Sequence, residues 1–406
     1  MNKAESERLG SLLEQRGFRS TAMPEKADVI VLNSCVVRQS AENRAVNKIH
    51  ALRQFKKLHP EIVLAVTGCL VDPDVAELKR AFPHVDYFFK AGELPQWLDE
   101  IKAGEMLPEH SPVSAYVTIM QGCNNFCSYC IVPFRRGRER SRPLSDIVEE
   151  AGQLVERGAR EIILLGQNVD SYGSDLSDGS DLSDVLEQVN GIEGLLRVRF
   201  LTSHPKDMTP KLIETVAKLD KVCAHINLPI QAGDDGILEA MKRGYTVDHY
   251  RRLVADIRAA MPSVALSTDV IVGFPTETGG QFQHTADLLS ELKFDTVHGA
   301  CYSPRTGTFA ARHFADDVPA VEKRRRLKVI EALQESILND TNSRLSGQTV
   351  EVLVEGKSKG KWRGRTGSDK LVFFSEAGDY VGRLVNVTID KTSPWSLQGI
   401  LEQSPD

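Results

Sequence analysis

The sequence predicts an α/β protein made of three parts: a doubly wound parallel α/β domain, a partial barrel of six βα units and a small β-barrel. Helical and strand patterns alternate through the first two parts, which favours parallel sheets. The tail changes to short strands separated by glycine, which is typical of a small barrel. We expect the domains to span residues 1–105, 110–338 and 340–404.

Composition supports a globular protein of two or three domains. Of the 406 residues, 41% are apolar and 26% are charged, and the net charge is −6, so any surface that attracts nucleic acid must be local. The N-terminus is polar, and no apolar run reaches membrane-spanning length. Seven cysteines without an export signal predict a cytoplasmic protein that uses thiols as metal ligands rather than in disulfides.

The N-terminal part predicts a parallel sheet with a cysteine after each of two strands. Strands expected at 27–33 and 62–67 are followed within two residues by Cys35 and Cys69. Parallel strands bring such positions to one sheet edge, where the thiols could share a metal. Two small buried residues at strand ends are the alternative. The chain opens with a helix where doubly wound domains open with a strand, so we expect a first strand upstream of Met1.

The middle of the chain predicts six βα units. Its strand candidates are Ala115–Met120, Glu161–Leu165, Leu196–Leu201, His225–Pro229, Val264–Val272 and Asp295–Tyr302. Such units form a parallel barrel or partial barrel, with function at the carboxyl ends of the strands. Four of those ends are polar or rich in glycine, at residues 166–168, 203–205, 231–233 and 273–277.

Three cysteines follow the first of these strands. Cys123, Cys127 and Cys130 have the spacing C-x3-C-x2-C on a predicted loop. Three thiolates can hold an iron–sulfur cubane and leave one iron open to another ligand. A zinc site with a distant fourth ligand and three unrelated core cysteines are the alternatives. We interpret Cys223 and Cys301, inside predicted strands, as packed core thiols.

Two basic runs predict contacts with RNA. One directly follows the cysteine loop and includes Arg135, Arg136 and Arg138. The other alternates through a predicted β segment at Lys357, Lys359, Lys361, Arg363 and Arg365. At a period of two these side chains would share one face and form a phosphate-binding stripe, with Trp362 turned toward the barrel interior. The alternative for each run is an ordinary solvated surface.

Several segments together resemble the radical S-adenosylmethionine (SAM) methylthiotransferases. The likeness rests on residues 121–142 around the cysteine loop and on 33–38 and 67–69 around Cys35 and Cys69. Residues 165–173 and 199–205 resemble the branch of that family formed by the tRNA-2-methylthio-N6-dimethylallyladenosine synthases. The C-terminal barrel resembles a TRAM domain, which is an RNA-binding module.

The resemblance implies SAM and two 4Fe-4S clusters as cofactors. Cys123, Cys127 and Cys130 would hold the cluster that binds SAM and cleaves it to a radical, and Cys35 and Cys69 would hold the cluster that supplies sulfur. The family's third cysteine of that second set would lie two residues before Met1, so the second cluster would be incompletely ligated in this chain. The residues expected around SAM are Gly166, Gln167, Ser203, Gln231, Gly273 and Phe274.

The function that the resemblance implies is a transferase that acts in tRNA processing. It would add a methylthio group to carbon 2 of N6-dimethylallyladenosine beside the anticodon. Its expected partners are tRNA, a reducing electron donor and an iron–sulfur or sulfur donor system, and we expect a monomer with no membrane contact. Related alternatives are a methylthiotransferase for threonylcarbamoyl-adenosine in tRNA and one for a ribosomal-protein aspartate. An alternative of another class is a non-catalytic iron–sulfur RNA-binding protein.

Overall fold

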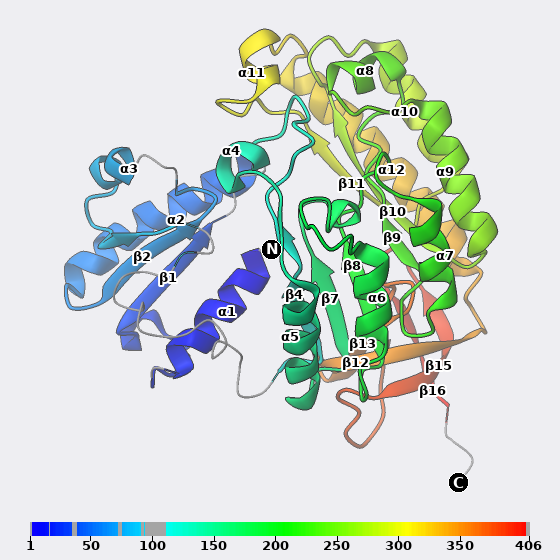
Figure 1. Ribbon diagram of the computed structural model, residues 1–406, viewed down its shortest axis with the longest axis horizontal. Coiled ribbons are helices and arrows are strands. Elements are labelled where there is room, and N and C mark those ends of the chain that lie inside the picture. The colour runs from blue at the N-terminus through cyan, green and yellow to red at the C-terminus, as the bar shows by residue number, and fades with distance from the viewer. Residues whose placement is uncertain are drawn as a thin grey trace.

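The computed structural model shows a helix-covered N-terminal sheet beside a central barrel, with a small β-barrel against the lower end of the central one (Figure 1). The residues that the structure describes are 2–15, 17–34, 39–71, 75–90, 93 and 111–402. Within them, no helix has both the length and the apolar character needed to cross a membrane.

The N-terminal domain contains a three-stranded parallel sheet. Its elements are α1 (Asn2–Gln15), β1 (Val29–Ser34), α2 (Gln39–Leu58), β2 (Val63–Gly68), α3 (Val75–Ala81) and β3 (Tyr87–Phe88). The strand order is β1-β2-β3, and Ser34 at the end of β1 lies opposite Gly68 at the end of β2. Both strands therefore end at the same sheet edge, directly before Cys35 and Cys69.

The central domain contains six parallel strands in sequence order, as predicted. They are β4 (Ser114–Thr118), β7 (Glu161–Leu165), β8 (Arg197–Leu201), β9 (His225–Asn227), β10 (Ala265–Val272) and β11 (Thr296–Cys301). They form two sheets of three strands, β4-β7-β8 and β9-β10-β11. A parallel bridge between Val198 and Val222 joins the two sheets. The six strands therefore form a partial barrel in which few hydrogen bonds join β8 to the segment of β9.

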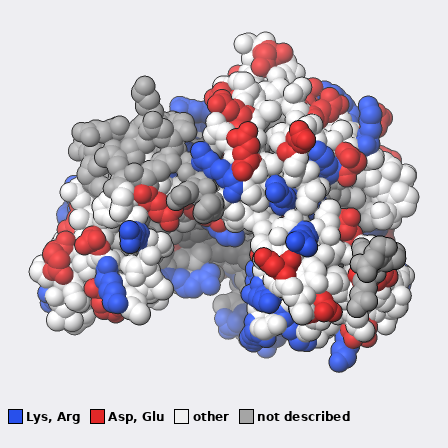
Figure 2. Space-filling model, turned by 90° about the horizontal axis from the view of Figure 1, so that it is seen from below, with Lys and Arg blue, Asp and Glu red and all other residues white. Residues whose placement is uncertain are grey.

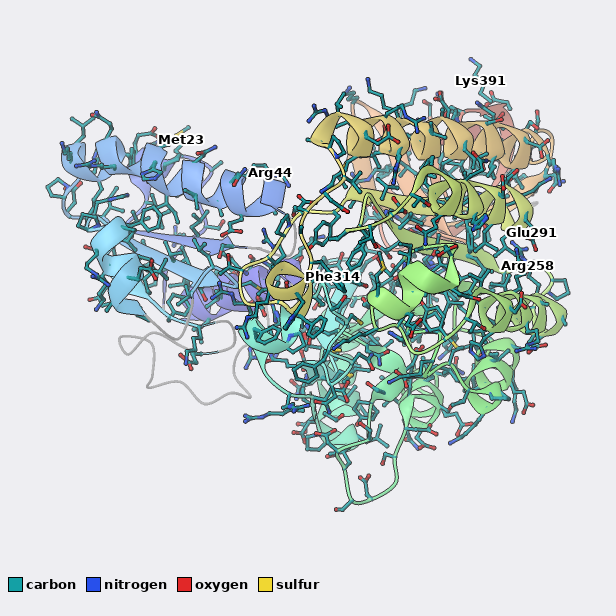
Figure 3. The ribbon with its side chains drawn as sticks, turned by 90° about the horizontal axis from the view of Figure 1, so that it is seen from above. Met23, Arg44, Arg258, Glu291, Phe314 and Lys391 are labelled. Carbon is teal, nitrogen blue, oxygen red and sulfur yellow. The ribbon has the colours of Figure 1, made fainter. Side chains whose placement is uncertain are left out.

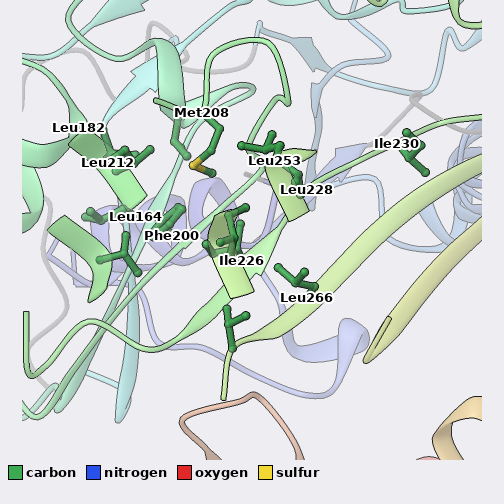
Figure 4. Close-up of a cluster of buried hydrophobic side chains, with 14 of the residues drawn as sticks. Leu164, Leu182, Phe200, Met208, Leu212, Ile226, Leu228, Ile230, Leu253 and Leu266 are labelled. Atoms are coloured by element: carbon green, nitrogen blue, oxygen red, sulfur yellow. The ribbon is translucent and has the colours of Figure 1, made fainter. Parts of the chain in front are cut away.

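Amphipathic helices cover the outside of this barrel. They are α5 (Leu144–Glu156), α6 (Leu182–Asn190), α7 (Pro210–Lys218), α8 (Asp235–Ala240), α9 (Val247–Ala260), α10 (Gly279–Leu292) and α12 (Ala320–Ser343). Threonine side chains cap several of them; Thr209, for example, accepts the amide hydrogen of Leu212. Figure 4 shows part of the core, where Phe200 of β8 and Ile226 of β9 lie among leucines from α7 and α9.

The C-terminal domain is a closed five-stranded barrel. Its strands are β12 (Thr349–Ser358), β13 (Lys361–Thr366), β14 (Leu371–Phe374), β15 (Leu384–Thr392) and β16 (Leu397–Leu401). Trp362 is buried in its core with Val352 and Phe374, as its position in the alternation predicted, and its indole N–H donates to the carbonyl of Glu376 at 3.0 Å.

Two buried arginines attach this small barrel to the amino end of the central one. Arg197 and Arg199 lie in the first half of β8. Arg197 donates to the carbonyl of Arg365 at 2.6 Å, and Arg199 donates to the carbonyls of Thr366 at 2.6 Å and Gly367 at 2.9 Å. The small barrel therefore covers the amino ends of the strands, opposite the end that carries the cysteine loop.

The prediction that the basic residues of 357–365 alternate along one β segment and share one face is wrong. Lys357 ends one strand and Lys361 begins the next, with register pairs Lys357–Trp362 and Ser358–Lys361. Between them, Lys359 and Gly360 have φ angles of +50° and +82° and form a tight turn. Two successive residues with positive φ are typical of a two-residue hairpin turn, and glycine adopts the second of these conformations without steric strain.

Candidate active site

The cysteine loop is held in place by the chain segment that follows it. The short strands β5 (Met120–Gln121) and β6 (Arg140–Ser141) pair on either side of it, and the amide of Cys123 donates to the carbonyl of Gly137 at 3.2 Å. Gly122 has a φ of +79°, and a Cβ there would lie 2.0 Å from the carbonyl oxygen of Arg138. Only glycine permits this approach, so the loop depends on it.

Glu139, the acid within the first basic run, holds the cysteine loop through hydrogen bonds with Asn124. It is buried, and Oε1 accepts the amide hydrogen of Asn124 at 3.1 Å and the hydroxyl of Ser171 at 3.1 Å. Oε2 accepts from Nδ2 of Asn124 at 3.2 Å and from the hydroxyl of Ser174 at 3.3 Å. This one carboxylate therefore ties the cysteine loop to the segment after β7.

Of the three cysteines of the loop, Cys127 is buried and Cys123 and Cys130 are half-buried. Burial raises the pKa of Cys123 to about 11 and that of Cys130 to about 12, and neighbouring cysteines add to both shifts. Such thiols lose their protons readily only when a bound cation compensates the charge. In the described residues no group of three His, Cys, Asp or Glu side chains is already arranged around a metal position. The fit to an iron–sulfur cluster therefore rests on the donor set, which is three thiols on one loop at a sheet end.

Arg243 is a buried partner of this loop that the sequence analysis missed. Its guanidinium donates to Sγ of Cys127 at 3.3 Å, to the hydroxyl of Tyr129 at 3.4 Å and to the carbonyl of Pro229 at 3.0 Å. The contact places a fixed positive charge beside the sulfur of Cys127. Residues 127 and 243 are 116 positions apart, so no local pattern could reveal this contact.

Buried polar atoms gather at the carboxyl ends of β7 and β8, beside the loop. Oδ1 of Asn168, Oγ of Ser203 and Nε2 of His204 are buried and make no hydrogen bond within the described structure. Burial, with Arg243 and Lys206 nearby, lowers the pKa of His204 to about 2, so the imidazole is neutral. Its Nδ1 accepts the amide hydrogen of Lys206 at 3.2 Å, which places the ring proton on Nε2. These groups can receive the polar parts of a cofactor.

The structure separates the residues predicted to bind SAM into two groups. Gln167 and Ser203 each present a buried polar atom without a partner in the described residues. Gly166, by contrast, packs on Met120, and Gln231 uses its backbone to bond Asp269.

The remaining two residues lie at the end of β10. The Gly273 amide donates to Oε2 of Glu277 at 2.6 Å, and Phe274 is fully buried against Tyr302 and Phe314. A packing role explains Phe274, whereas a direct contact with SAM stays a prediction for it.

Of the second thiol pair, the structure describes Cys69. It is buried just after β2, and its amide donates to the carbonyl of Ser34 at 2.9 Å. Cys35 lies outside the described residues. Arg136 of α4 (Val132–Arg136) reaches this region from the central domain and pairs with Glu5 of α1 at 2.6 Å. Burial opposes its charge, but the bond with Glu5 and the Cys69 thiol raise the pKa of Arg136.

Comparison with known proteins identifies the family. Models of the Radical SAM superfamily, of Uncharacterized protein family UPF0004 and of the TRAM domain match residues 117–289, 1–90 and 343–401. A tRNA-2-methylthio-N(6)-dimethylallyladenosine synthase of Dehalococcoides mccartyi is 54% identical over 99% of this chain and 96% of that protein. One from Roseiflexus is 49% identical over 100% and 88%. The chain belongs to the tRNA-2-methylthio-N6-dimethylallyladenosine synthase family.

Membership in this synthase family implies SAM and 4Fe-4S clusters as cofactors and tRNA as substrate. A solved cobalamin-dependent SAM radical enzyme, OxsB, shares the fold, with a TM-score of 0.51 and 11% identity over 80% of this chain and 53% of that one. The C-terminal five-stranded barrel coincides with the TRAM match.

The basic residues predicted to bind RNA have unequal surroundings in this synthase. Arg136 is occupied inside the protein by Glu5, whereas Arg138 stacks on the exposed ring of Phe126 at 4.4 Å. In the small barrel, Arg363 and Arg365 both pair with Glu355, at 3.3 Å and 3.4 Å. Seen from below, positive and negative side chains are mixed over the surface (Figure 2).

Three lysines of the second run have weaker ties. Lys357 lies 4.1 Å from the centroid of the Trp362 ring, Lys361 donates to Gln398 at 2.8 Å, and Lys359 is exposed in the turn. The lysines at the hairpin tip are therefore the part of the predicted stripe that is most open to a phosphate.

Proposed function

We propose that this chain adds a methylthio group to carbon 2 of N6-dimethylallyladenosine beside the anticodon of tRNA. The observation that carries the proposal is the three-cysteine loop at the carboxyl end of a partial barrel, in a chain 54% identical over nearly its whole length to a synthase of that name. Carbon 2 of adenine carries an unactivated C–H bond. Acid–base side chains cannot open such a bond, so a cofactor must supply the chemistry.

The chain's own residues divide the remaining work. Cys123, Cys127 and Cys130 would hold one cluster, and Arg243 would orient the sulfur of Cys127. When bound, the cluster and SAM supply one-electron cleavage chemistry that no side chain offers. The polar atoms of Gln167 and Ser203 would receive the polar groups of SAM.

Cys69, with Cys35, would hold the second cluster on the N-terminal domain. The interaction of Cys69 with Arg136, a residue of the central domain that follows the cysteine loop in the chain, supports a place for this cluster close to the central domain. A reducing electron donor and a source of replacement sulfur complete the proposed system. The TRAM barrel would hold the RNA through the lysines of the β12–β13 hairpin.

The test combines protein reconstitution with analysis of tRNA. A strain that lacks the gene is complemented with the parent chain, with Cys127→Ala or with the control Cys301→Ala, whose thiol belongs to β11 and not to the loop. Mass spectrometry of tRNA should show the methylthio product for the parent and the control, and only prenylated adenosine for Cys127→Ala. Anaerobic reconstitution should show lower iron content for Cys127→Ala than for the control. Persistence of the methylthio product in the deletion strain would refute the proposal.

A further inference from the structure

Three exposed aromatic rings surround the cysteine loop. Phe126 lies within the loop, Phe134 on α4 and Phe309 on α11 (Phe309–His313), and their exposed fractions are 36%, 47% and 36%. Large apolar side chains left in water beside a polar site are typical of binding surfaces. Segment α11 lies against the loop, because the amide of Ala310 donates to the carbonyl of Ser128 at 2.7 Å.

Phe126 has a backbone conformation that packing alone does not explain. Its φ is +47°, in the left-handed region that bulky residues rarely adopt. Strain of this kind concentrates at sites of function. A ring that helped to stabilise the interior would be covered, but more than a third of Phe126 remains exposed. The loop therefore keeps a strained aromatic residue at the surface between two cysteine ligands.

The rings of Phe126 and Phe134 form one surface. Their centroids are 6.2 Å apart at an angle of 87°, an edge-to-face contact, and the Arg138 guanidinium lies 4.4 Å from the centroid of Phe126. The two rings and the guanidinium together suit a nucleotide, because a base can contact the rings while its phosphate pairs with the arginine. Figure 1 shows α4, which carries Phe134, between the N-terminal domain and the barrel.

The proposed substrate needs such a surface close to the thiols. Its dimethylallyl group is attached to N6, and carbon 2 belongs to the same six-membered ring as the carbon that carries N6. When carbon 2 reaches the cluster region, the apolar tail must therefore lie only a few bond lengths away. Water is a poor environment for five hydrocarbon carbons, so an apolar contact at this place would favour the prenylated base.

We propose that Phe126 and Phe134 form the binding site for the dimethylallyl group of the substrate adenosine, with Arg138 holding an adjacent phosphate. The proposal rests on the proposed function and adds a specificity determinant to it. A polar, charged substituent on N6, such as threonylcarbamoyl, gains nothing from these two rings. The pair therefore selects the prenylated adenosine over other modified adenosines.

The test measures binding of two anticodon stem-loop RNAs that differ only in the dimethylallyl group on the adenosine. Fluorescence anisotropy with the reconstituted parent protein should show at least tenfold tighter binding of the prenylated RNA. Phe134→Ala should reduce this preference about tenfold and leave the affinity for the unmodified RNA unchanged. Phe134→Leu, which keeps an apolar side chain, should retain most of the preference, and Phe126→Leu should behave in the same way.

Two controls separate the possible outcomes. Leu58→Ala removes an exposed apolar side chain at the end of α2 and should leave both affinities unchanged. Iron content should match the parent in every variant, which shows that the loop still holds its cluster. Equal weakening of both RNAs by Phe134→Ala would overturn the proposed site while the proposed function stands. Absence of any methylthio product from the parent protein would instead refute the proposed function.

Discussion

Buried arginines of the central barrel hold both neighbouring domains, but they bind different groups on the two sides. Toward the N-terminal domain, Arg136 pairs with Glu5 at 2.6 Å and Arg305 pairs with Glu42 at 2.9 Å. Toward the TRAM barrel, Arg197 and Arg199 donate mainly to backbone carbonyls. The first interface thus relies on pairs of side chains. The second adds main-chain acceptors to its own side-chain pairs, which are Arg197–Glu351 and Lys370–Asp295, each at 3.0 Å.

This difference predicts different rigidity. A carbonyl within or beside β13 cannot move without its barrel, so the TRAM domain is fixed in position on β8. A carboxylate at the end of a side chain can change its rotamer without moving the backbone of its helix, so it restrains a domain less tightly than a main-chain carbonyl does. The side of the molecule that carries the thiols is therefore the side that can adjust, and the far end serves as a fixed support.

The largest effect is expected from Arg199→Ala. Its guanidinium also pairs with the buried Glu161 at 2.7 Å, so the substitution leaves an uncompensated carboxylate and two buried carbonyls without their donor. We expect the free energy of unfolding to fall by about 3–5 kcal/mol, measured by urea denaturation followed through tryptophan fluorescence.

The matched control for Arg199→Ala is Arg251→Ala. Arg251 forms an exposed pair with Glu291 at 3.0 Å, and Glu291 lies on the side of the barrel away from Arg44 and the N-terminal domain (Figure 3). The expected change is below about 1 kcal/mol. If both variants lost a similar amount of unfolding free energy, the buried position of Arg199 would not explain its effect.

A second prediction compares two buried carboxylates on β7 and just after it. Glu161 has Arg199 as partner, whereas the neighbours of Asp170 in the described structure are the His204 amide, the Ser203 hydroxyl and the Asp207 carboxylate. Burial therefore raises the pKa of Asp170 to about 7. The folded state holds a proton that the unfolded state releases near pH 4, so this contribution to stability is complete below pH 4 and is lost as the pH rises through 7.

Asp170→Asn should remove that pH dependence. Relative to the parent, the free energy of unfolding of the variant should rise by about 1–3 kcal/mol between pH 4 and pH 8. Urea denaturation at several pH values measures it. Parallel pH profiles for the two proteins would contradict the expected protonation of Asp170.

The third prediction tests the adjustable interface with a double-mutant cycle. Glu42→Gln, Arg305→Met and the double variant should give a coupling energy of about 1–2 kcal/mol, because the Arg305 side chain is buried and Glu42 is only partly exposed. The cycle isolates this pair from other contacts of Arg305. A coupling near zero would mean that other contacts hold the N-terminal domain.

The smallest effect is expected from Arg365→Ala. This variant tests whether the main chain or the side chain of Arg365 holds the TRAM domain on β8. The Arg365 side chain is 40% exposed and pairs with Glu355 and Asp369, whereas its carbonyl binds Arg197. The substitution keeps that carbonyl, so the loss of stability should stay below about 1 kcal/mol. A loss as large as that of Arg199→Ala would show that the side chain, rather than the backbone, holds the TRAM domain.

Local patterns explain which features the sequence could predict. The six βα units rest on short-range signals, and the structure contains them as predicted. The spacing of Cys123, Cys127 and Cys130 is also a local signal, but the ligand set that it predicts stays a prediction. The proposed boundaries at 105, 110, 338 and 340 stay predictions, and so do the assigned roles of the site residues. The prediction that the basic residues of 357–365 share one face is wrong because the chain turns at Lys359 and Gly360. An alternating pattern of lysines and arginines does not reveal such a turn.

Long-range contacts explain what the sequence could not predict. The partners Arg243 and Cys127, or Arg199 and Thr366, are more than a hundred residues apart and share no periodicity. Arg136 belonged to a basic run that suggested a phosphate contact, but the fold places Glu5 of α1 against it. Charge runs show composition, and only the three-dimensional structure shows which charges are already neutralised.

The attachment of the TRAM barrel to β8 has a consequence for protein synthesis. Arg197 and the carbonyl that it binds are 168 residues apart. At a bacterial or eukaryotic translation rate, that separation corresponds to a delay of roughly 8 to 34 seconds. In the last part of this interval, after β11 has ended at Cys301, the six strands of the central barrel are complete in sequence while Arg197 and Arg199 still lack their acceptors in the small barrel. The TRAM barrel, which is synthesised after the central barrel, therefore completes the burial of Arg197 and Arg199 on β8.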